Sequence, residues 1–278
     1  MATKAGVSER FTLERFAQNP FYQEVNRRLV QLAGLRPGAR VVDLGAGTGA
    51  VTRMLVEQVA SPDAASEVIA VEPSESALEV ARRNVENLGG AVVRFVQGGA
   101  EKLSQIVLRP VDAVFFCNAI HLVREKANVM QEVGRTLRKG GVFSFNTSFF
   151  EGAEPPESLQ FYRRWMMKAL RILRSQYGLS PDKSLRAIAR QPLSRDEYIA
   201  LLKENGFRIR ENQILPVPMT LKGFEDISEY SLFIEGAMPG VPLDKGSQAL
   251  KQGAREAFQE LGIETSPRYW LLVVASKK

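Results

Sequence analysis

An acid and three glycines alternate with other residues over positions 43–49: Asp43, Gly45, Gly47 and Gly49. Glycines adopt positive φ readily and let a backbone approach a ligand closely. Their spacing differs from the G-x-G-x-x-G of dinucleotide-binding loops. A carboxylate beside the loop would repel a phosphate, but it accepts hydrogen bonds from a cation or an amide. The pattern therefore favours a positively charged nucleoside without phosphate as the ligand.

The segments on either side of this run suit a ligand-binding loop. Val41 and Val42 read as a short buried strand, and residues 51–59 carry apolar side chains at helical spacing. The first turn of a helix offers backbone N–H groups that have no partner within the helix. Ala46 and Thr48, which stand between the glycines, are therefore expected to contact the ligand as well.

The run also resembles the first motif of the class I (Rossmann-like) S-adenosylmethionine-dependent methyltransferases, which typically reads D/E-x-G-x-G-x-G. S-adenosylmethionine is a cationic nucleoside without phosphate. The resemblance covers residues 38–148 closely, and 194–215 and 268–276 more loosely. It implies an α/β fold with a doubly wound, seven-stranded, mostly parallel sheet whose last strand is antiparallel.

A second acid, Glu72, follows the apolar stretch 68–71, which reads as the next strand. In sheets of this type an acid at the carboxyl end of the second strand holds the ribose hydroxyls, so Glu72 and Pro73 are candidate contacts of the donor. In an alternative role, the Glu72 carboxylate would stabilise the N-terminus of a helix over residues 74–88. The two roles are compatible.

The third expected strand, residues 91–97, leads into Gly99, Ala100 and Glu101. Many members of the resembling family carry an Asp in place of Gly99, and that Asp accepts a hydrogen bond from the adenine amino group. In this chain the backbone of Ala100, or Glu101, is the candidate that replaces it.

The apolar run 111–117 predicts a buried strand that ends at Cys117. Ligands in this fold class lie beyond the carboxyl ends of the strands, so Cys117 and Asn118 are expected near the methyl donor. Nucleic-acid amino-methyltransferases typically carry D/N/S-P-P-Y/F here, whereas residues 118–121 read Asn-Ala-Ile-His. This difference argues against a nucleobase amine as the acceptor.

His121 is the single histidine of the chain. An imidazole can act as a general base near neutral pH, which makes His121 the candidate catalytic residue. The alternative is a structural ring that packs beside the loop, as is common in similar sequences. We expect no metal site, because one histidine and one cysteine without ligand spacing do not form one.

Residues 8–34 carry apolar side chains at helical spacing, with several aromatic residues among the first of them. In the resembling family the N-terminal segment often closes over the methyl donor. We therefore expect residues 1–37 to form a helical segment or lid, with Tyr22 as a candidate contact of the donor. In the alternative interpretation these aromatic side chains belong to the core.

The regular alternation of strands and helices breaks at residues 149–193 and 221–265, which we interpret as insertions that form a helical cap. The methyltransferase core would then comprise residues 38–148, 194–220 and 266–278. The second insertion is expected to hold two helices separated by residues 239–242. The first should hold an amphipathic helix. Its apolar stripe is Leu159, Tyr162, Met166, Ala169, Leu170, Leu173 and Tyr177.

Basic residues gather in the segment 158–210, with twelve Lys or Arg against four Asp or Glu, while the whole chain has a net charge of +6. The amphipathic helix there could be a lid over an anionic or lipophilic substrate, a transient contact to a membrane surface, or a packed helix with a solvated basic face. We favour the lid. Because few aromatic residues alternate with the basic ones, the segment disfavours a nucleic-acid partner.

Composition sets broad limits. Apolar content of 45% and charged content of 24% are ordinary for a globular protein. A single cysteine forms no disulfide within the chain. We find no apolar run of the ~18 residues that a membrane span needs, and no apolar signal core. These features predict a cytoplasmic protein.

The patterns together predict a methyltransferase that uses S-adenosylmethionine to O- or C-methylate a small lipophilic or anionic molecule. The ubiquinone and menaquinone C-methyltransferases share the core pattern, but the insertions leave that substrate unassigned. One alternative is an RNA- or protein-directed methyltransferase that uses the basic segment 158–210. Two others are a nicotinamide-dependent oxidoreductase, which the glycine spacing disfavours, and a non-catalytic nucleoside-binding module.

Overall fold

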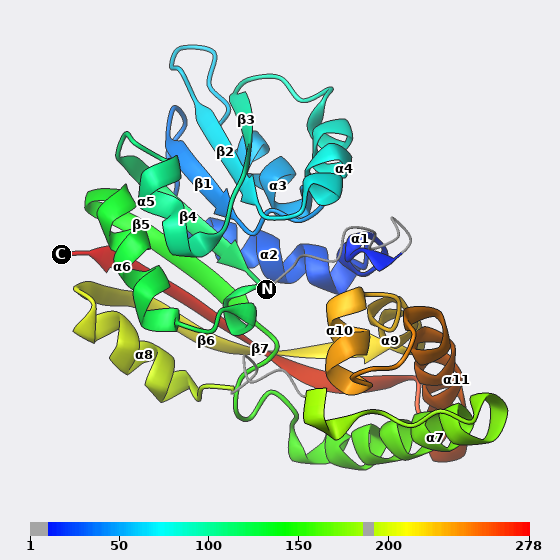
Figure 1. The fold of residues 1–278 in the computed structure, drawn as a ribbon. Coiled ribbons are helices and arrows are strands. Elements are labelled where there is room, and N and C mark those ends of the chain that lie inside the picture. Colours follow the sequence, from blue (N-terminus) through cyan, green and yellow to red (C-terminus); the bar gives the residue numbers. More distant parts are fainter. Residues whose placement is uncertain (1–10, 186–191) are drawn as a thin grey trace. The chain divides into compact units, whose positions relative to one another are not determined.

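A computed structural model describes residues 11–185 and 192–278 of the chain (Figure 1). These residues divide into two compact units. We call one the sheet unit (residues 23–153, 192–215 and 269–278) and the other the helical unit (residues 11–22, 154–185 and 216–268). Residues 1–10 of the predicted N-terminal segment, and Arg186 and Arg190 of the basic segment, lie outside the described residues. The predicted division into core and cap stays a prediction.

The strands of the described residues form one sheet in the order β3-β2-β1-β4-β5-β7-β6 (Figure 1). The strands β1 to β5 pair in parallel, and β7 runs antiparallel to β5. The predicted seven-stranded sheet with an antiparallel last strand is therefore confirmed. The strands are β1 (Arg40–Leu44), β2 (Glu67–Glu72), β3 (Val92–Gln97), β4 (Val111–Cys117), β5 (Leu137–Thr147), β6 (Phe207–Thr220) and β7 (Thr265–Lys277).

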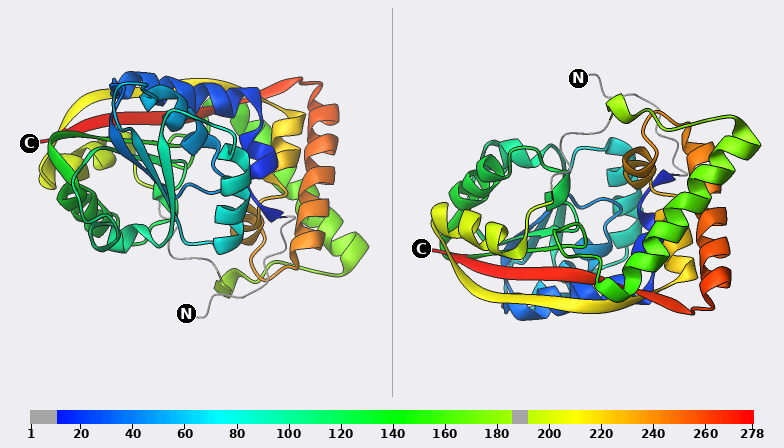
Figure 2. Two further views of the ribbon diagram at one scale, coloured as in Figure 1. Left: turned by 90° about the horizontal axis from the view of Figure 1, so that it is seen from above. Right: turned by 90° about the horizontal axis from the view of Figure 1, so that it is seen from below.

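Helices cover both faces of this sheet, as expected for a doubly wound fold (Figures 1 and 2). On one face lie α2 (Pro20–Ala33) and α3 (Ala50–Val59), and α4 (Glu75–Val85) packs beside α3 and β3. On the other face lie α5 (Leu103–Ile106), α6 (Lys126–Thr136) and α8 (Arg195–Glu204). The sequence Ser194-Arg195-Asp196-Glu197 predicts a capping box, and this capping box begins α8.

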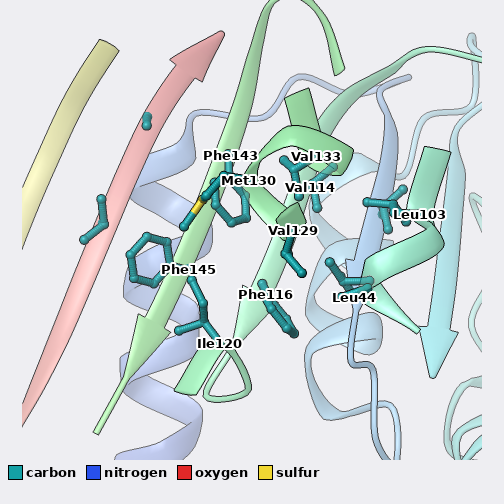
Figure 3. Packing of buried hydrophobic residues seen from close by; sticks show 14 of the residues in the cluster. Leu44, Leu103, Val114, Phe116, Ile120, Val129, Met130, Val133, Phe143 and Phe145 are labelled. Carbon is teal, nitrogen blue, oxygen red and sulfur yellow. The ribbon is translucent and has the colours of Figure 1, made fainter. Parts of the chain in front are cut away.

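The core of the sheet unit holds the strand ends in place. Val129, Met130 and Val133 of α6 pack with Phe116 of β4 and Phe143 of β5 in one buried cluster (Figure 3). Burial of apolar surface contributes roughly 25 cal/mol per Å², so this cluster strongly favours one arrangement of β4, β5 and α6. The carboxyl end of β4 is thereby fixed beside that of β1.

The start of β5 differs from the prediction. The sequence predicts a helix over residues 123–137 that the basic, glycine-ended residues 138–141 stop, and a strand over residues 142–147. Instead α6 ends at Thr136 and β5 begins at Leu137. Val111 of β4 pairs with Leu137, and Ala113 pairs with Val142, so residues 138–141 form an irregularity within the strand. The glycine turn is thus accommodated as a bulge.

The helical unit comprises α1 (Glu14–Ala17), α7 (Leu159–Tyr177), α9 (Leu221–Ile227), α10 (Ser231–Ala237) and α11 (Leu243–Leu261), with the adjoining ends of β6 and β7. Residues 221–262 were expected to form two helical pieces, but they form three helices. The predicted apolar stripe of α7 is wrong in part: Leu159 and Leu170 are 37% and 39% exposed, whereas Phe161, Trp165 and Ile172 are buried. Aromatic rings of α9 and α11 pack against Phe161, which turns that face of α7 inward.

The basic face of α7 pairs with acids of α11. Lys168 Nζ lies 2.5 Å from Glu260, and Arg171 lies 2.7 Å from Glu256. Much of the basic charge is therefore neutralised within the helical unit, and the lid role of α7 stays a prediction. Among the described residues, no helix is long and apolar enough to cross a membrane.

Candidate functional site

The glycine loop between β1 and α3 is tied to the end of β2. The backbone N–H groups of Gly45 and Ala46 both donate to the carbonyl oxygen of Val71, at 2.8 and 3.1 Å. The N–H of Gly49 donates to the carbonyl of Ala46 at 2.9 Å, which closes the turn. The loop therefore has a defined shape before any ligand is considered.

Gly47 and Gly49 are glycines for different structural reasons. Gly47 and Gly49 have φ of 53° and 86°, a region that side chains rarely adopt. A Cβ at Gly49 would lie 3.1 Å from the Cα of Ala81, so close packing also disfavours a side chain at this position. A Cβ at Gly47 would meet no atom within 4 Å. Space is therefore open beside the backbone of Gly47, as a ligand-binding loop requires.

Glu72 binds the loop directly. Its Oε2 accepts a hydrogen bond from the N–H of Gly47 at 2.9 Å, and its Oε1 accepts one from the N–H of Ser74 at 3.0 Å. Ser74 caps α4, so the structural role considered for Glu72 is present. Burial raises the pKa of Glu72, while these two hydrogen bonds counteract the rise. The ribose contact assigned to Glu72 stays a prediction.

Asp43 lies at the same end of the sheet, buried under the loop. Its Oδ2 accepts a hydrogen bond from the hydroxyl of Thr52 on α3 at 2.6 Å. Burial raises the pKa of Asp43 to about 7; the Thr52 bond opposes this rise and the negative charge of Glu72 adds to it. The sheet register explains this proximity, because Asp43 pairs with Ala70, two residues before Glu72.

The two acidic side chains at the glycine loop, Asp43 and Glu72, suit a cationic ligand. In the described parts of the chain, no ion pair involves Asp43 or Glu72. Two partly or fully buried carboxylates without a basic partner are costly, which is the physical cause of their raised pKa values. A positively charged ligand beside the loop would relieve that cost. The residues present therefore suit the cationic nucleoside expected from the sequence.

After β3, the side chain of Glu101 places a carboxylate beside Gly99, the position where many members of the resembling family carry an Asp. A Cβ at Gly99 would lie only 2.6 Å from Oε2 of Glu101, so the Glu101 carboxylate occupies the space beside Gly99. Ala100 is buried at the start of a short helical turn. The carbonyl of Pro73 accepts a hydrogen bond from the Gln97 side chain at 3.1 Å. Contacts of all these residues to a ligand stay predictions.

Asn118, directly after β4, is held by a buried polar network. Among the described residues it is the one non-glycine with positive φ, at 49°. Its N–H donates to the Asn146 side-chain oxygen at 2.9 Å, and the Asn146 amide donates to Asn26 at 2.7 Å. Its own Oδ1 accepts from the N–H and hydroxyl of Ser148. The backbone N–H and Oδ1 of Asn118 are thus engaged within the protein. The contact of Asn118 with a ligand stays a prediction.

Cys117 precedes Asn118 and lies at the buried end of β4. Burial, helped by the negative charge of Asp43, raises the pKa of the Cys117 thiol well above its usual range. The thiol is therefore protonated at neutral pH and unsuited to act as a nucleophile. Its expected contact with the donor stays a prediction.

His121 is buried in the short helical turn that follows β4. Its Nδ1 lies 3.2 Å from Oγ1 of Thr147 on β5, and its ring stacks on Phe149 at 4.4 Å between centroids. The packing that the alternative interpretation expected is thus present. A catalytic role remains compatible with it, and stays a prediction.

Tyr22 belongs to the helical unit, whereas the other candidate residues belong to the sheet unit. It is buried and packs edge-on against Phe16, with ring centroids 5.4 Å apart. This packing accords with the alternative in which the aromatic residues form core. Its contact with a donor stays a prediction.

Sequence reasoning missed several residues that hold the candidates in place. Thr52 binds Asp43, Asn146 binds Asn118, and Thr147 binds His121. A signal existed for Asn146 and Thr147, because they are polar residues at the end of the strand predicted over residues 142–147. No such signal exists for Asn26, because it lies within an ordinary amphipathic helix. In the described residues, no cluster of three or more His, Cys, Asp or Glu is placed to hold a metal ion.

Comparison with known proteins adds an independent line of evidence. A family model for a methyltransferase domain matches residues 35–173, which is half of the chain. The ubiquinone/menaquinone biosynthesis C-methyltransferase UbiE of Ectopseudomonas mendocina is 34% identical over 116 residues, which cover 41% of this chain and 44% of that protein. The chain spans about half the length of the curated relatives that it matches.

Solved structures share the fold. A methyltransferase from Thiobacillus denitrificans, determined with S-adenosyl-L-homocysteine, is similar with a TM-score of 0.58 and 18% identity, covering 96% of this chain and 98% of that one. The cyclopropane synthase MmaA2 of Mycobacterium tuberculosis has a TM-score of 0.58 and 14% identity, covering 99% and 100%. At these identities the likeness concerns the fold.

Proposed function

Because the chain belongs to the class I S-adenosylmethionine-dependent methyltransferases, we propose that it transfers a methyl group from S-adenosylmethionine to a small-molecule acceptor. The observation that carries the proposal is the pair of carboxylates at the glycine loop, Glu72 and Asp43. Glu72 accepts a hydrogen bond from the N–H of Gly47, and its negative charge adds to the rise in the pKa of Asp43. Neither carboxylate has a basic partner among the described residues.

The residues at and beside the glycine loop suit the parts of the donor. Glu72 is assigned to the ribose hydroxyls, since its carboxylate lies at the carboxyl end of β2 beside the loop. Asp43 supplies negative charge behind the loop, and the backbone of Gly47 leaves space for close approach. The Glu101 carboxylate, next to Gly99, is assigned to the adenine amino group.

The donor supplies a methyl group that its positively charged sulfur has already activated. The protein therefore has to hold and align the donor and the acceptor and to exclude water. Correct alignment of two reactants is by itself a large rate effect, worth as much as ~7–11 kcal/mol in model reactions. Cys117, Asn118 and His121 are buried at the end of β4, which supports their assignment to the side of the site that excludes water.

For the acceptor we propose a small lipophilic or anionic molecule that is O- or C-methylated. The support comes from the names of relatives: one is a ubiquinone/menaquinone biosynthesis C-methyltransferase, and a similar fold belongs to a cyclopropane synthase. The pairing of Lys168 and Arg171 with acids of α11 weakens the alternative of an RNA-directed enzyme, since these cations are engaged within the chain.

Calorimetry on the purified protein tests the proposal. We expect S-adenosylmethionine and S-adenosylhomocysteine each to bind at one site per chain, and NAD to give no thermal stabilisation. Incubation with methyl-labelled donor and a fractionated extract of small molecules should then transfer label to one fraction. Absence of binding by both nucleosides, or stabilisation by NAD, would contradict the proposal. Binding without transfer to any small-molecule, RNA or protein fraction would favour a non-catalytic nucleoside-binding module.

A further inference from the structure

The helix α3, which follows the glycine loop, has no cap from its own sequence. Its N-cap position is Gly49, which makes no capping hydrogen bond with a side chain, and its first turn carries no acid. The first N–H groups of a helix have no partner within the helix, and they favour a negative charge nearby. An acceptor for this turn therefore has to come from another element.

Thr52, the third residue of α3, binds such an acceptor twice. Its hydroxyl donates to Oδ2 of Asp43 at 2.6 Å, and its backbone N–H also donates to this carboxylate. Both side chains are buried, Thr52 completely and Asp43 with 1% of its surface exposed. Asp43 of β1 thus caps α3 from a neighbouring strand, and Thr52 holds the carboxylate through two hydrogen bonds.

The other titratable groups around Asp43 do not favour its ionised form. The negative charge of Glu72 on β2 raises the pKa of Asp43. Cys117 of β4 supplies no positive charge, because burial raises the pKa of its thiol and keeps it protonated. Arg53, beside Thr52 on α3, is exposed and forms an ion pair within its own helix at 3.1 Å. In the described residues, Thr52 is therefore the group whose hydrogen bonds favour a charged Asp43.

We propose that Thr52 is a positioning residue for the methyl donor, because it fixes the Asp43 carboxylate beside the glycine loop in the ionised form that attracts a cation. Burial alone would favour the neutral form of this carboxyl group. The inference rests on the proposed function, since the cation is S-adenosylmethionine. Thr52 acts through Asp43, and a hydroxyl that only filled space in the core would not influence how donor binding depends on pH.

The affinity for S-adenosylmethionine should depend on pH through Asp43. Burial raises the pKa of Asp43 to about 7, so the fraction of the protein with a charged Asp43 increases through neutral pH. The Thr52 hydroxyl opposes the effect of burial, and its removal should raise this pKa further. The affinity should then increase with pH in the natural protein, and at a higher pH in a variant without the hydroxyl.

Thr52→Val removes the hydroxyl but keeps the branched shape of the side chain and the backbone N–H. Calorimetry compares its affinity for S-adenosylmethionine with that of the natural protein between about pH 6 and pH 9. We expect binding about tenfold weaker than natural near pH 6 and nearly natural binding near pH 9, because loss of a hydrogen bond to a charged group shifts the titration of Asp43 by roughly one pH unit. Titration of the donor's own groups affects both proteins equally and cancels in this ratio.

Two further variants make the comparison specific. Thr52→Ser retains a hydroxyl and should follow the natural protein at every pH. Thr136→Val is the matched control, because it removes a buried hydroxyl that donates to the carbonyl oxygen of Glu132 at 2.9 Å. Its affinity relative to the natural protein should not change with pH. A ratio for Thr52→Val that is also constant over pH would overturn the proposal, since it would show a purely structural role.

A measurement without ligand distinguishes failure of this inference from failure of the proposed function. In the natural protein the free energy of unfolding should fall as pH rises from 3.8 to about 7, and in Thr52→Val the fall should continue to higher pH. An end of the fall at the same pH in both proteins would show that Thr52 does not hold Asp43 charged. Absence of donor binding by the natural protein would instead contradict the proposed function. If Thr52→Val does not fold, Thr52→Ala, which also lacks the hydroxyl, serves in both measurements.

Discussion

The carboxylate of Glu72 accepts a hydrogen bond from the backbone N–H of Gly47, with 2.9 Å between Oε2 and the nitrogen. The bond joins the end of β2 to the middle of the glycine loop. The other carboxylate oxygen binds the N–H of Ser74 at the start of α4. One acidic side chain thus holds two of the segments that surround the proposed donor site.

Replacement of Glu72 tests this arrangement. We expect Glu72→Ala to weaken binding of S-adenosylmethionine at least tenfold, which corresponds to about 1.4 kcal/mol. The reason is the loss of a charged acceptor, whose hydrogen bonds contribute roughly 1.5–3 kcal/mol each. Calorimetry measures the affinity. Glu75→Ala, which removes an exposed acid from the first turn of α4, is the control and should bind normally. Equal affinities in both variants would remove the ribose assignment.

Substitution of the loop glycines separates binding from stability. We expect Gly47→Ala to lose most donor binding, because its methyl group enters the open space beside the loop, with a stability loss of about 1–2 kcal/mol from the left-handed φ. Gly49→Ala carries the same strain and also presses on Ala81, so its free energy of unfolding should fall further. Denaturant unfolding and calorimetry measure the two effects. Normal donor binding by Gly47→Ala would count against the loop as the binding surface.

Much of the sheet could be predicted because its strands are apolar runs with clear ends. The strand β4 has the predicted bounds, since its buried run ends at the polar Asn118. The sequence predicts a strand over residues 207–215, but β6 extends to Thr220 through Pro216 and Pro218. It is one of the two edge strands of the sheet, where a missing N–H need not break a ladder of hydrogen bonds. The sequence alone does not reveal which strand is at the edge.

The helical unit and the supporting residues of the site were harder to predict. The buried face of α7 includes Phe161 and Trp165 because partners distant in sequence, such as Phe224, pack against them. The acid and the glycines of the loop could be found from their types and spacing. The bond from Thr52 to Asp43 could not, because it depends on how α3 is set against β1. Such hydrogen bonds and buried faces depend on contacts between helices and strands, which the periodicity of apolar residues in the sequence does not predict.

The raised pKa of Asp43 predicts how stability depends on pH. Burial raises this pKa from 3.8 to about 7, so between these values the folded protein keeps a proton that the unfolded chain releases. The free energy of unfolding should therefore fall as pH rises through this window, by roughly 1.4 kcal/mol per pH unit for one proton. The raised pKa of Glu72 acts in the same direction.

The variant Asp43→Asn tests whether Asp43 causes this fall in the free energy of unfolding with rising pH. The variant keeps an oxygen that can accept from Thr52 but has no charge to bury, so we expect a shallower pH dependence and higher stability than the natural protein above pH ~7. Urea unfolding at several pH values measures both. An identical pH dependence in Asp43→Asn would assign the effect to other groups.

Close packing between α7 and α11 gives a prediction for the helical unit. A Cβ at Gly253 of α11 would lie 2.7 Å from the backbone nitrogen of Ala169, so Gly253→Ala should force the helices apart and lower the free energy of unfolding by about 1–3 kcal/mol. Gly134 of α6 is the matched control, since the nearest atom to its Cβ, in the Phe207 ring, is 3.9 Å away. Gly134→Ala should stabilise by ~0.5–1 kcal/mol through helix propensity. Urea unfolding compares the two, and a stabilising Gly253→Ala would contradict the close approach of these helices.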